Sequence, residues 1–102
     1  MQTLVVVPSG AQQSWLAPSD LTVVGVTGEA INLSANNVLI STDPSLDVNF
    51  VYNVPAVYER IICILSSDGY RPLGHSILKG ESVYFSSASV GGQLNLFYEP
   101  AE

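Results

Sequence analysis

The sequence predicts an all-β fold, a single-domain antiparallel β-sandwich of the jelly-roll or Greek-key kind. Short segments alternate apolar and polar residues, which is the pattern of strands with one buried face. Turn residues recur about every 8 to 12 positions. No segment repeats its apolar residues at helical spacing for long enough to predict a helix. Because neither a linker nor an internal repeat divides the chain, we expect one domain to span residues 1–102.

The N-terminal segment predicts an edge or arm strand followed by a polar strand or loop. Residues 2–7 are mostly apolar and end at Pro8, which cannot donate a hydrogen bond to a sheet. Residues 11–20 are more polar and contain Trp15, the only tryptophan. We expect Trp15 to anchor this segment in the protein's own core. Because aromatic residues are enriched at interfaces, a role as an exposed contact stays open as the alternative.

The next segments predict three strands and two turns. Residues 21–26 are rich in β-branched side chains, and Gly25 within them indicates a bulge or a close approach to the backbone. Residues 27–29 predict a turn, and residues 30–34 and 38–42 predict two further strands. Residues 43–45 predict a turn with proline at its second position.

Two strands are expected in the middle of the chain. Residues 46–52 alternate cleanly between apolar and polar side chains. Residues 57–65 are the most apolar stretch, which predicts a central strand that is covered on both faces. Cys63 lies in this stretch and is the only cysteine, so an intrachain disulfide is excluded. We expect it to be a small buried hydrophobic residue.

The C-terminal third predicts a β-hairpin. A turn at 66–69 and an ordered loop at 70–74 are expected before it. Residues 81–88 and 93–99 alternate apolar and polar side chains, and the glycine pair at 91–92 suits a tight turn between them. The side chains expected to face the core are those of Val83, Phe85, Leu94, Leu96 and Tyr98.

The composition is acidic and poor in charge. Nine Asp and Glu residues against three basic residues give a formal net charge of −6, and charged residues make up only 12% of the chain. Affinity for nucleic acid comes largely from Lys and Arg, so no nucleic-acid partner is expected. We find no secretion signal and no stretch of transmembrane length, so we expect no membrane partner and synthesis in a cytoplasm.

The titratable residues predict no catalytic, metal or cofactor site. His75 is the only histidine, and a Ser/His/Asp arrangement would need Asp68 and a nearby serine without a nucleophile-elbow motif. We therefore expect His75 to be a hydrogen-bonded loop residue. Asp43 and Asp47 are four positions apart, which does not match a Ca²⁺-binding EF-hand loop. The sequence predicts a protein that is not an enzyme and that binds no cofactor.

In its overall style the chain resembles the small all-β decoration, or cement, proteins of tailed bacteriophage capsids. The resemblance rests on the Met-initiated chain of this length, on Ser- and Val-rich strands, and on the closing segments at 78–88 and 92–99. It implies a structural assembly protein that forms homo-oligomers, commonly trimers. Such a protein clamps neighbouring subunits of a capsid, or of another repetitive shell, on the virion surface after synthesis in the host cytoplasm. No family site transfers residue by residue.

For such contacts we single out Trp15, Tyr70 and Arg71, together with the N-terminal strand and its residues Leu4 and Val6. Burial of apolar and aromatic side chains across the seams of a shell would supply affinity, multiplied by simultaneous contacts. On this hypothesis, replacing Trp15 with alanine weakens particle binding without unfolding the protein. If this variant is instead unfolded, Trp15 belongs to the core.

Two alternatives remain open from the sequence. One is a carbohydrate- or receptor-binding module, in which several of the five tyrosines and the tryptophan gather on one sheet face. The other is a tail or fibre component of a virion.

Overall fold

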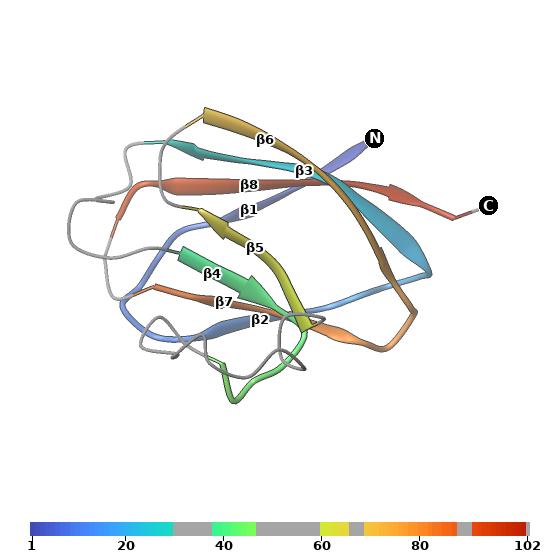
Figure 1. Ribbon diagram of the computed structural model, residues 1–102, viewed down its shortest axis with the longest axis horizontal. Coiled ribbons are helices and arrows are strands. Elements are labelled where there is room, and N and C mark those ends of the chain that lie inside the picture. The colour runs from blue at the N-terminus through green and yellow to red at the C-terminus, as the bar shows by residue number, and fades with distance from the viewer. Residues whose placement is uncertain (30–37, 47–59, 66–68, 88–90, 102) are drawn as a thin grey trace.

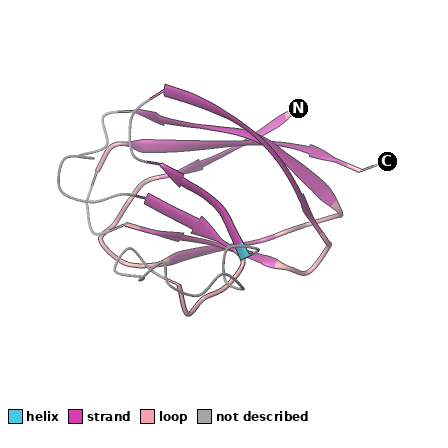
Figure 2. Cartoon of the chain, viewed as in Figure 1, coloured by secondary structure: helices cyan, strands magenta, loops and turns pink. Residues whose placement is uncertain are grey.

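The computed structural model describes residues 1–29, 38–46, 60–65, 69–87 and 91–101, and strands make up most of this part of the chain (Figure 2). The strands form two four-stranded antiparallel sheets that pack together (Figure 1). Sheet 1 has the order β1 (Gln2–Val6), β8 (Gln93–Pro100), β3 (Leu21–Glu29), β6 (Gly69–Ile77). Sheet 2 has the order β2 (Gln13–Leu16), β7 (Ser82–Ser86), β4 (Val38–Ser41), β5 (Ile61–Leu65). The described residues contain no helix with the length and hydrophobicity of a membrane span.

The pairing of the strands is that of a jelly roll. Strand β1 pairs with β8, β2 with β7, β3 with β6 and β4 with β5, so the pairs are nested in the chain. Successive pairs alternate between the two sheets, and the contacts of β3 with β8 and of β4 with β7 complete each sheet. This is the order expected when one long antiparallel hairpin is rolled up into a sandwich. The predicted all-β sandwich is therefore confirmed.

The predicted C-terminal hairpin is wrong. Strand β7 pairs with β2 and β4 in sheet 2, whereas β8 pairs with β1 and β3 in sheet 1. The glycines at 91 and 92 have φ values of 90° and 75° where the chain enters β8 from the opposite sheet. Alternation and paired glycines identify two strands and a break, but they do not identify the neighbour of each strand.

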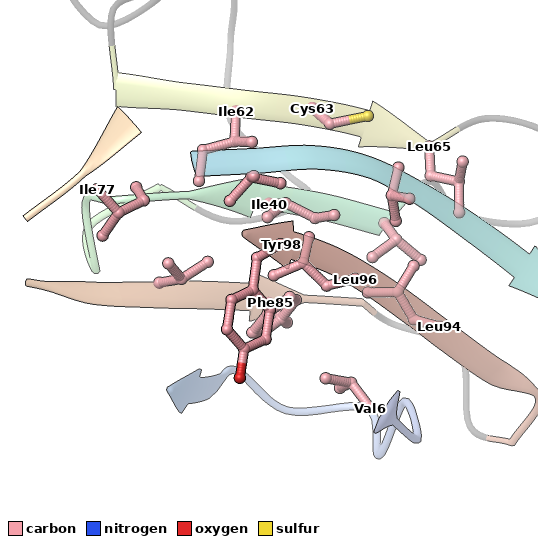
Figure 3. Close-up of a cluster of buried hydrophobic side chains, with 14 of the residues drawn as sticks. Val6, Ile40, Ile62, Cys63, Leu65, Ile77, Phe85, Leu94, Leu96 and Tyr98 are labelled. Carbon is pink, nitrogen blue, oxygen red and sulfur yellow. The ribbon is translucent and has the colours of Figure 1, made fainter. Parts of the chain in front are cut away.

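The core lies between the two sheets, and both contribute to it (Figure 3). Along β8, Leu94, Leu96 and Tyr98 are buried, while the side chains between them face outward. Along β7, Val83 and Phe85 are buried in the same way, so the predicted inward faces of both strands are confirmed. The remaining buried members of this hydrophobic cluster are Val6, Ala17, Leu21, Val23, Val26, Val38, Ile40, Ile62, Cys63, Leu65 and Ile77.

Two predictions about strand position are corrected in the second half of the chain. The stretch 57–65 was expected to be central, but β5 begins at Ile61 and is the last described strand of sheet 2. The apolar composition of a strand indicates that its side chains are buried, and Cys63 and Leu65 of β5 do belong to the core. It does not indicate where the strand lies in its sheet. The predicted loop at 70–74 lies inside β6 instead. Because β6 ends its sheet among the described strands, it accommodates Pro72, which lacks an amide hydrogen.

Most other predictions from the first half are confirmed or fall outside the described residues. Residues 2–6 form β1 at the end of sheet 1, and residues 38–41 form β4. The strand from residue 21 extends to Glu29, so the turn predicted at 27–29 is wrong, because these residues pair with both neighbouring strands. The register of β3 shifts between Val23 and Gly25, which is the expected bulge. The strands predicted at 30–34 and over most of 46–52, and most of the turn at 66–69, lie outside the described residues.

The predicted turn at 43–45 is confirmed and carries a dense set of hydrogen bonds. The Leu46 amide donates to the Asp43 carbonyl over 3.2 Å. The Asp43 carboxylate accepts bonds from the Ser45 hydroxyl at 2.7 Å, from the Ser45 amide at 2.9 Å and from Arg60 Nη1 at 2.7 Å. The two Ser45 bonds, followed by the Arg60 bond, lower the pKa of Asp43 to about 2. The donors thus favour the ionised carboxylate.

The Asp43 turn should make stability depend on pH in acid. Because its pKa is lower in the folded chain, Asp43 stabilises the fold fully above about pH 4, and this contribution is lost as pH falls towards 2. We expect Asp43→Asn to flatten the pH dependence of the urea midpoint between pH 5 and pH 2 relative to the unchanged protein. Arg60→Ala should flatten it less, since both Ser45 bonds remain. Identical slopes for the Asn variant and the unchanged protein would contradict this assignment.

Candidate interaction surfaces

One side of the sandwich is formed by β1 and β2. These strands follow one another in the chain, and each is the end strand of its sheet. Sheet 1 runs from β1 to β6, and sheet 2 runs from β2 to β5. Strands β5 and β6 contact each other at the opposite side of the sandwich. Among the described strands, the outer edges of β1 and β2 have no sheet partner. We call this the β1/β2 side.

The β1/β2 side lacks charged side chains from its own strands. From Met1 to Ser19 the sequence contains no Asp, Glu, Lys, Arg or His, and Asp20 is the first charged side chain. Val5 of β1 is 54% exposed, Val7 is 56% exposed, and Leu16 at the end of β2 is 62% exposed. Edge strands of soluble proteins are usually protected by charge, proline or a bulge, and β1 has none of these before Pro8.

The predicted contact residues of the N-terminal strand point inward. Val6 belongs to the buried cluster, and Leu4 packs against it. Leu4 and Val6 face the same way as their cross-strand partners Leu96 and Leu94. The prediction that this strand makes contacts stays a prediction, and Val5 is the large hydrophobic side chain of β1 that is exposed.

Trp15 anchors β2 to the rest of the protein, as the favoured interpretation of the sequence predicts. Its side chain is half-buried and packs against the core cluster. Its ring lies 4.9 Å from the Tyr98 ring, centroid to centroid, with a tilt of 52°. The Tyr98 hydroxyl donates to Oε1 of Gln2 at 2.9 Å. These contacts connect both end strands, β1 and β2, to β8.

Tyr70 and Arg71 lie on β6, on the opposite side from the other candidates. Arg71 Nη1 donates to the Ile64 carbonyl of β5 at 2.8 Å and lies 3.8 Å from the Cys63 sulfur. This contact joins the end strands of the two sheets. Burial raises the pKa of the Cys63 thiol, and Arg71 partly opposes the shift. The buried, protonated thiol is the small hydrophobic residue that the sequence predicts.

Tyr70 lies on the outer face of sheet 1. Its ring packs over Gly25 of the neighbouring strand and against Phe97 of β8. The close approach that Gly25 predicts is therefore confirmed, together with the bulge. The five predicted contact residues do not form one site, since Leu4, Val6 and Trp15 lie near the β1/β2 side and Tyr70 and Arg71 lie on β6.

The titratable residues of the described chain are dispersed. His75 is half-buried within β6 rather than in a loop, where its Cα partner on β3 is Val23. Its proposed partner Asp68 lies outside the described residues, and so does Asp47. Asp43 is committed to Ser45 and Arg60. Within the described ranges, no group of three or more His, Cys, Asp or Glu side chains is placed to hold a metal ion.

The sequence interpretation missed the most distinctive surface property of the molecule. The absence of charge from residues 1–19 is visible in the sequence. Its importance depends on the fold, because β1 and β2 belong to different sheets and yet end both of them at one side. Comparison with known proteins adds no assignment: no protein-family model matches this chain, and no curated protein matches it significantly.

Proposed function

We propose that this protein is a structural assembly protein that associates through its β1/β2 side, as a decoration protein on a virion capsid or a similar repetitive shell. The observation that carries the proposal is that residues 1–19 bring no charged side chain to this side, while Val5, Val7 and Leu16 are exposed on a chain of net charge −6. Its partners are other copies of the chain, with a trimer favoured, and the subunits of the shell.

Electrostatics favours this side over the others as a contact between copies. Two molecules that each carry a formal charge of −6 repel one another, and a contact between acidic surfaces adds the cost of desolvating carboxylates. A contact through residues 1–19 brings no carboxylate side chain of these strands into the interface. Burial of their exposed apolar side chains contributes roughly 25 cal/mol for each Å² removed from water.

The edges of β1 and β2 add a second source of affinity. An edge strand can accept a strand from a partner, and the new backbone hydrogen bonds extend the sheet. Attachment to a shell multiplies weak contacts, because each copy of an oligomer binds a repeated subunit at the same time. The capsid is the preferred shell because of the resemblance to decoration proteins, which itself rests on the style of the sequence.

The test is the mass of the protein in solution, measured by light scattering over a wide range of concentration. We expect a closed oligomer whose mass does not change with concentration. Val5→Glu should raise its dissociation constant by at least about tenfold, because each copy adds a carboxylate to the contact. Ser76→Glu, the same charge change at an exposed position of β6, should leave the mass unchanged. Both positions are exposed, so both variants should fold.

A protein that is monomeric at every concentration would contradict the proposed contact between copies. So would a folded Val5→Glu variant that keeps the original mass. Binding to a shell is measured separately, by sedimentation of the protein with capsids assembled without it. In that experiment Val5→Glu should remain in the supernatant when the unchanged protein and Ser76→Glu pellet with the capsids.

A further inference from the structure

Tyr70 presents an ordered aromatic ring on the outer face of sheet 1. The residue is 59% exposed, yet several contacts determine where its ring lies. Its hydroxyl donates to the Val24 carbonyl at 3.3 Å. Its ring centroid lies 6.1 Å from that of Phe97, with a tilt of 51° between the planes. An exposed ring held in this way loses little conformational freedom when a ligand binds to it.

The Tyr70 ring packs directly over Gly25 of β3. A Cβ at position 25 would lie 2.6 Å from Cζ of Tyr70, closer than side-chain atoms approach one another, so the ring rests directly on the backbone of β3. Pro72 and Phe97 are the cross-strand partners of Gly25 on either side. One side of the Tyr70 ring therefore faces the sheet and its neighbours, and the other side is open to solvent.

A row of polar side chains begins beside the ring. Thr27 is the cross-strand partner of both Tyr70 and Asn95, and all three face outward. Asn95 Nδ2 donates to the Thr27 hydroxyl oxygen at 3.0 Å, and Gln93 Nε2 donates to Asn95 Oδ1 at 2.8 Å. Asn95 is only 8% exposed, whereas Thr27 and Gln93 are half-buried. The ladder thus holds an accessible hydroxyl and an accessible amide in fixed positions.

The centre of this face carries no charge, and its ends are acidic. The outward residues in the two central rows are Tyr70, Thr27, Asn95, Val5, Pro72, Gly25, Phe97 and Thr3. Glu29 is the cross-strand partner of Gln93 at one end, and Glu99 is that of Thr22 at the other. Carboxylates at both ends disfavour an anionic ligand, such as a nucleic acid or a sulfated or sialylated glycan.

We propose that this outer face binds a neutral carbohydrate. The C–H face of one pyranose ring stacks on the open side of Tyr70, with a hydroxyl group bonded to Thr27, and a further sugar of the same oligosaccharide reaches Gln93 along the row. An ordered aromatic surface combined with a few fixed polar groups is the arrangement that binds and orients small polar ligands. Tyr70 lies on β6, at the far end of sheet 1 from β1, but Val5 of β1 ends the same row beside Asn95, so a contact through Val5 adjoins this site.

The site is tested by NMR titration of the full ¹⁵N-labelled chain with neutral oligosaccharides. Suitable probes are cellohexaose, maltohexaose and laminarihexaose at up to about 10 mM, where a site of millimolar affinity is saturated. A sialylated oligosaccharide serves as the anionic comparison. We expect at least one neutral probe to shift the amides of Tyr70, Thr27 and Gln93, and the anionic probe to bind more weakly or not at all.

Four variants test whether such binding depends on the Tyr70 ring. Tyr70→Ala should weaken binding by about tenfold or more, since it removes the stacking surface. Gly25→Ala should weaken it similarly, because the new methyl group displaces a ring that is still present. Tyr70→Phe keeps the ring and should bind within about threefold of the unchanged protein. Tyr84→Ala removes a ring from the outer face of sheet 2 and should leave binding unchanged.

The absence of shifts with all the neutral probes would overturn the proposal, as would shifts confined to residues outside this face. Unchanged affinity in a folded Tyr70→Ala variant would also overturn it. If Tyr70→Ala instead lowers the oligomeric mass, the face is buried against another copy and is not a carbohydrate site. That outcome would extend the contact between copies to this face, whereas the other outcomes leave the contact tested with Val5→Glu unaffected.

Discussion

Replacing Leu96 with alanine is expected to lower the free energy of unfolding by about 3 to 4 kcal/mol. Leu96 is fully buried in β8, a central strand of sheet 1. Its cross-strand partners are Leu4 on β1 and Val26 on β3, and its side chain belongs to the cluster between the sheets (Figure 3). Partners on both sides limit how far the backbone can relax, so truncation should leave a cavity. This loss is large, because the free energy of unfolding of most proteins is only about 5 to 15 kcal/mol.

The change is measured by urea denaturation at one fixed protein concentration, because association contributes to apparent stability. Leu78→Ala is the matched control, since it is also a leucine truncation but removes an exposed side chain outside β1 and β2. It should change the free energy of unfolding by no more than about 0.5 kcal/mol. If Leu96→Ala loses no more than this control, the arrangement of the core between the sheets is wrong.

Replacing Trp15 with alanine is expected to lower the free energy of unfolding by about 2 to 3 kcal/mol. The ring packs against the core cluster and contacts Tyr98, which is itself bonded to Gln2. Its removal therefore loosens β2 and leaves part of the Tyr98 ring without a neighbour. The expected loss is smaller than that for a fully buried tryptophan, because Trp15 is only half-buried.

Two comparisons make this prediction specific. Leu78→Ala truncates an exposed side chain outside β1 and β2 and should be nearly neutral for stability. Trp15→Phe keeps part of the contact with Tyr98 and should fall between alanine and tryptophan. If Trp15→Ala is instead as stable as the unchanged protein but fails to associate, Trp15 is a contact residue and the core interpretation is wrong.

Local sequence patterns predicted the features that depend on neighbours along the chain. Alternation predicted which side chains of β7 and β8 face the core, since a strand has only two faces. Gly25 predicted a bulge or a close approach, because a glycine within a β-branched strand lacks the side chain that would pack there, and the structure has both. Asp43, Pro44 and Ser45 predicted their turn through the residue preferences of its positions.

The candidate surfaces were less predictable for a physical reason. Tyr70 was singled out from the sequence, but the contact of its ring with Gly25 joins residues that are 45 positions apart. The hydrogen bonds of the ladder likewise join β3 and β8, in which Thr27 and Asn95 are 68 positions apart. Leu4 and Val6 were chosen as contact residues because they lie in an edge strand, and only the sheet register shows that they face inward.

The sequence by itself determined that this protein is built of strands, where many of them begin and end, and which residues β7 and β8 bury. The tertiary structure alone decided which strands are neighbours. Strands β7 and β8 satisfy the pattern of a hairpin, yet they pair in opposite sheets. Strand β5 has the composition of a central strand but lies last in the described order. Burial of an apolar face depends on the residues of that strand, whereas pairing depends on backbone hydrogen bonds that every strand can offer equally. The choice among partners is made by the packing of the whole sandwich.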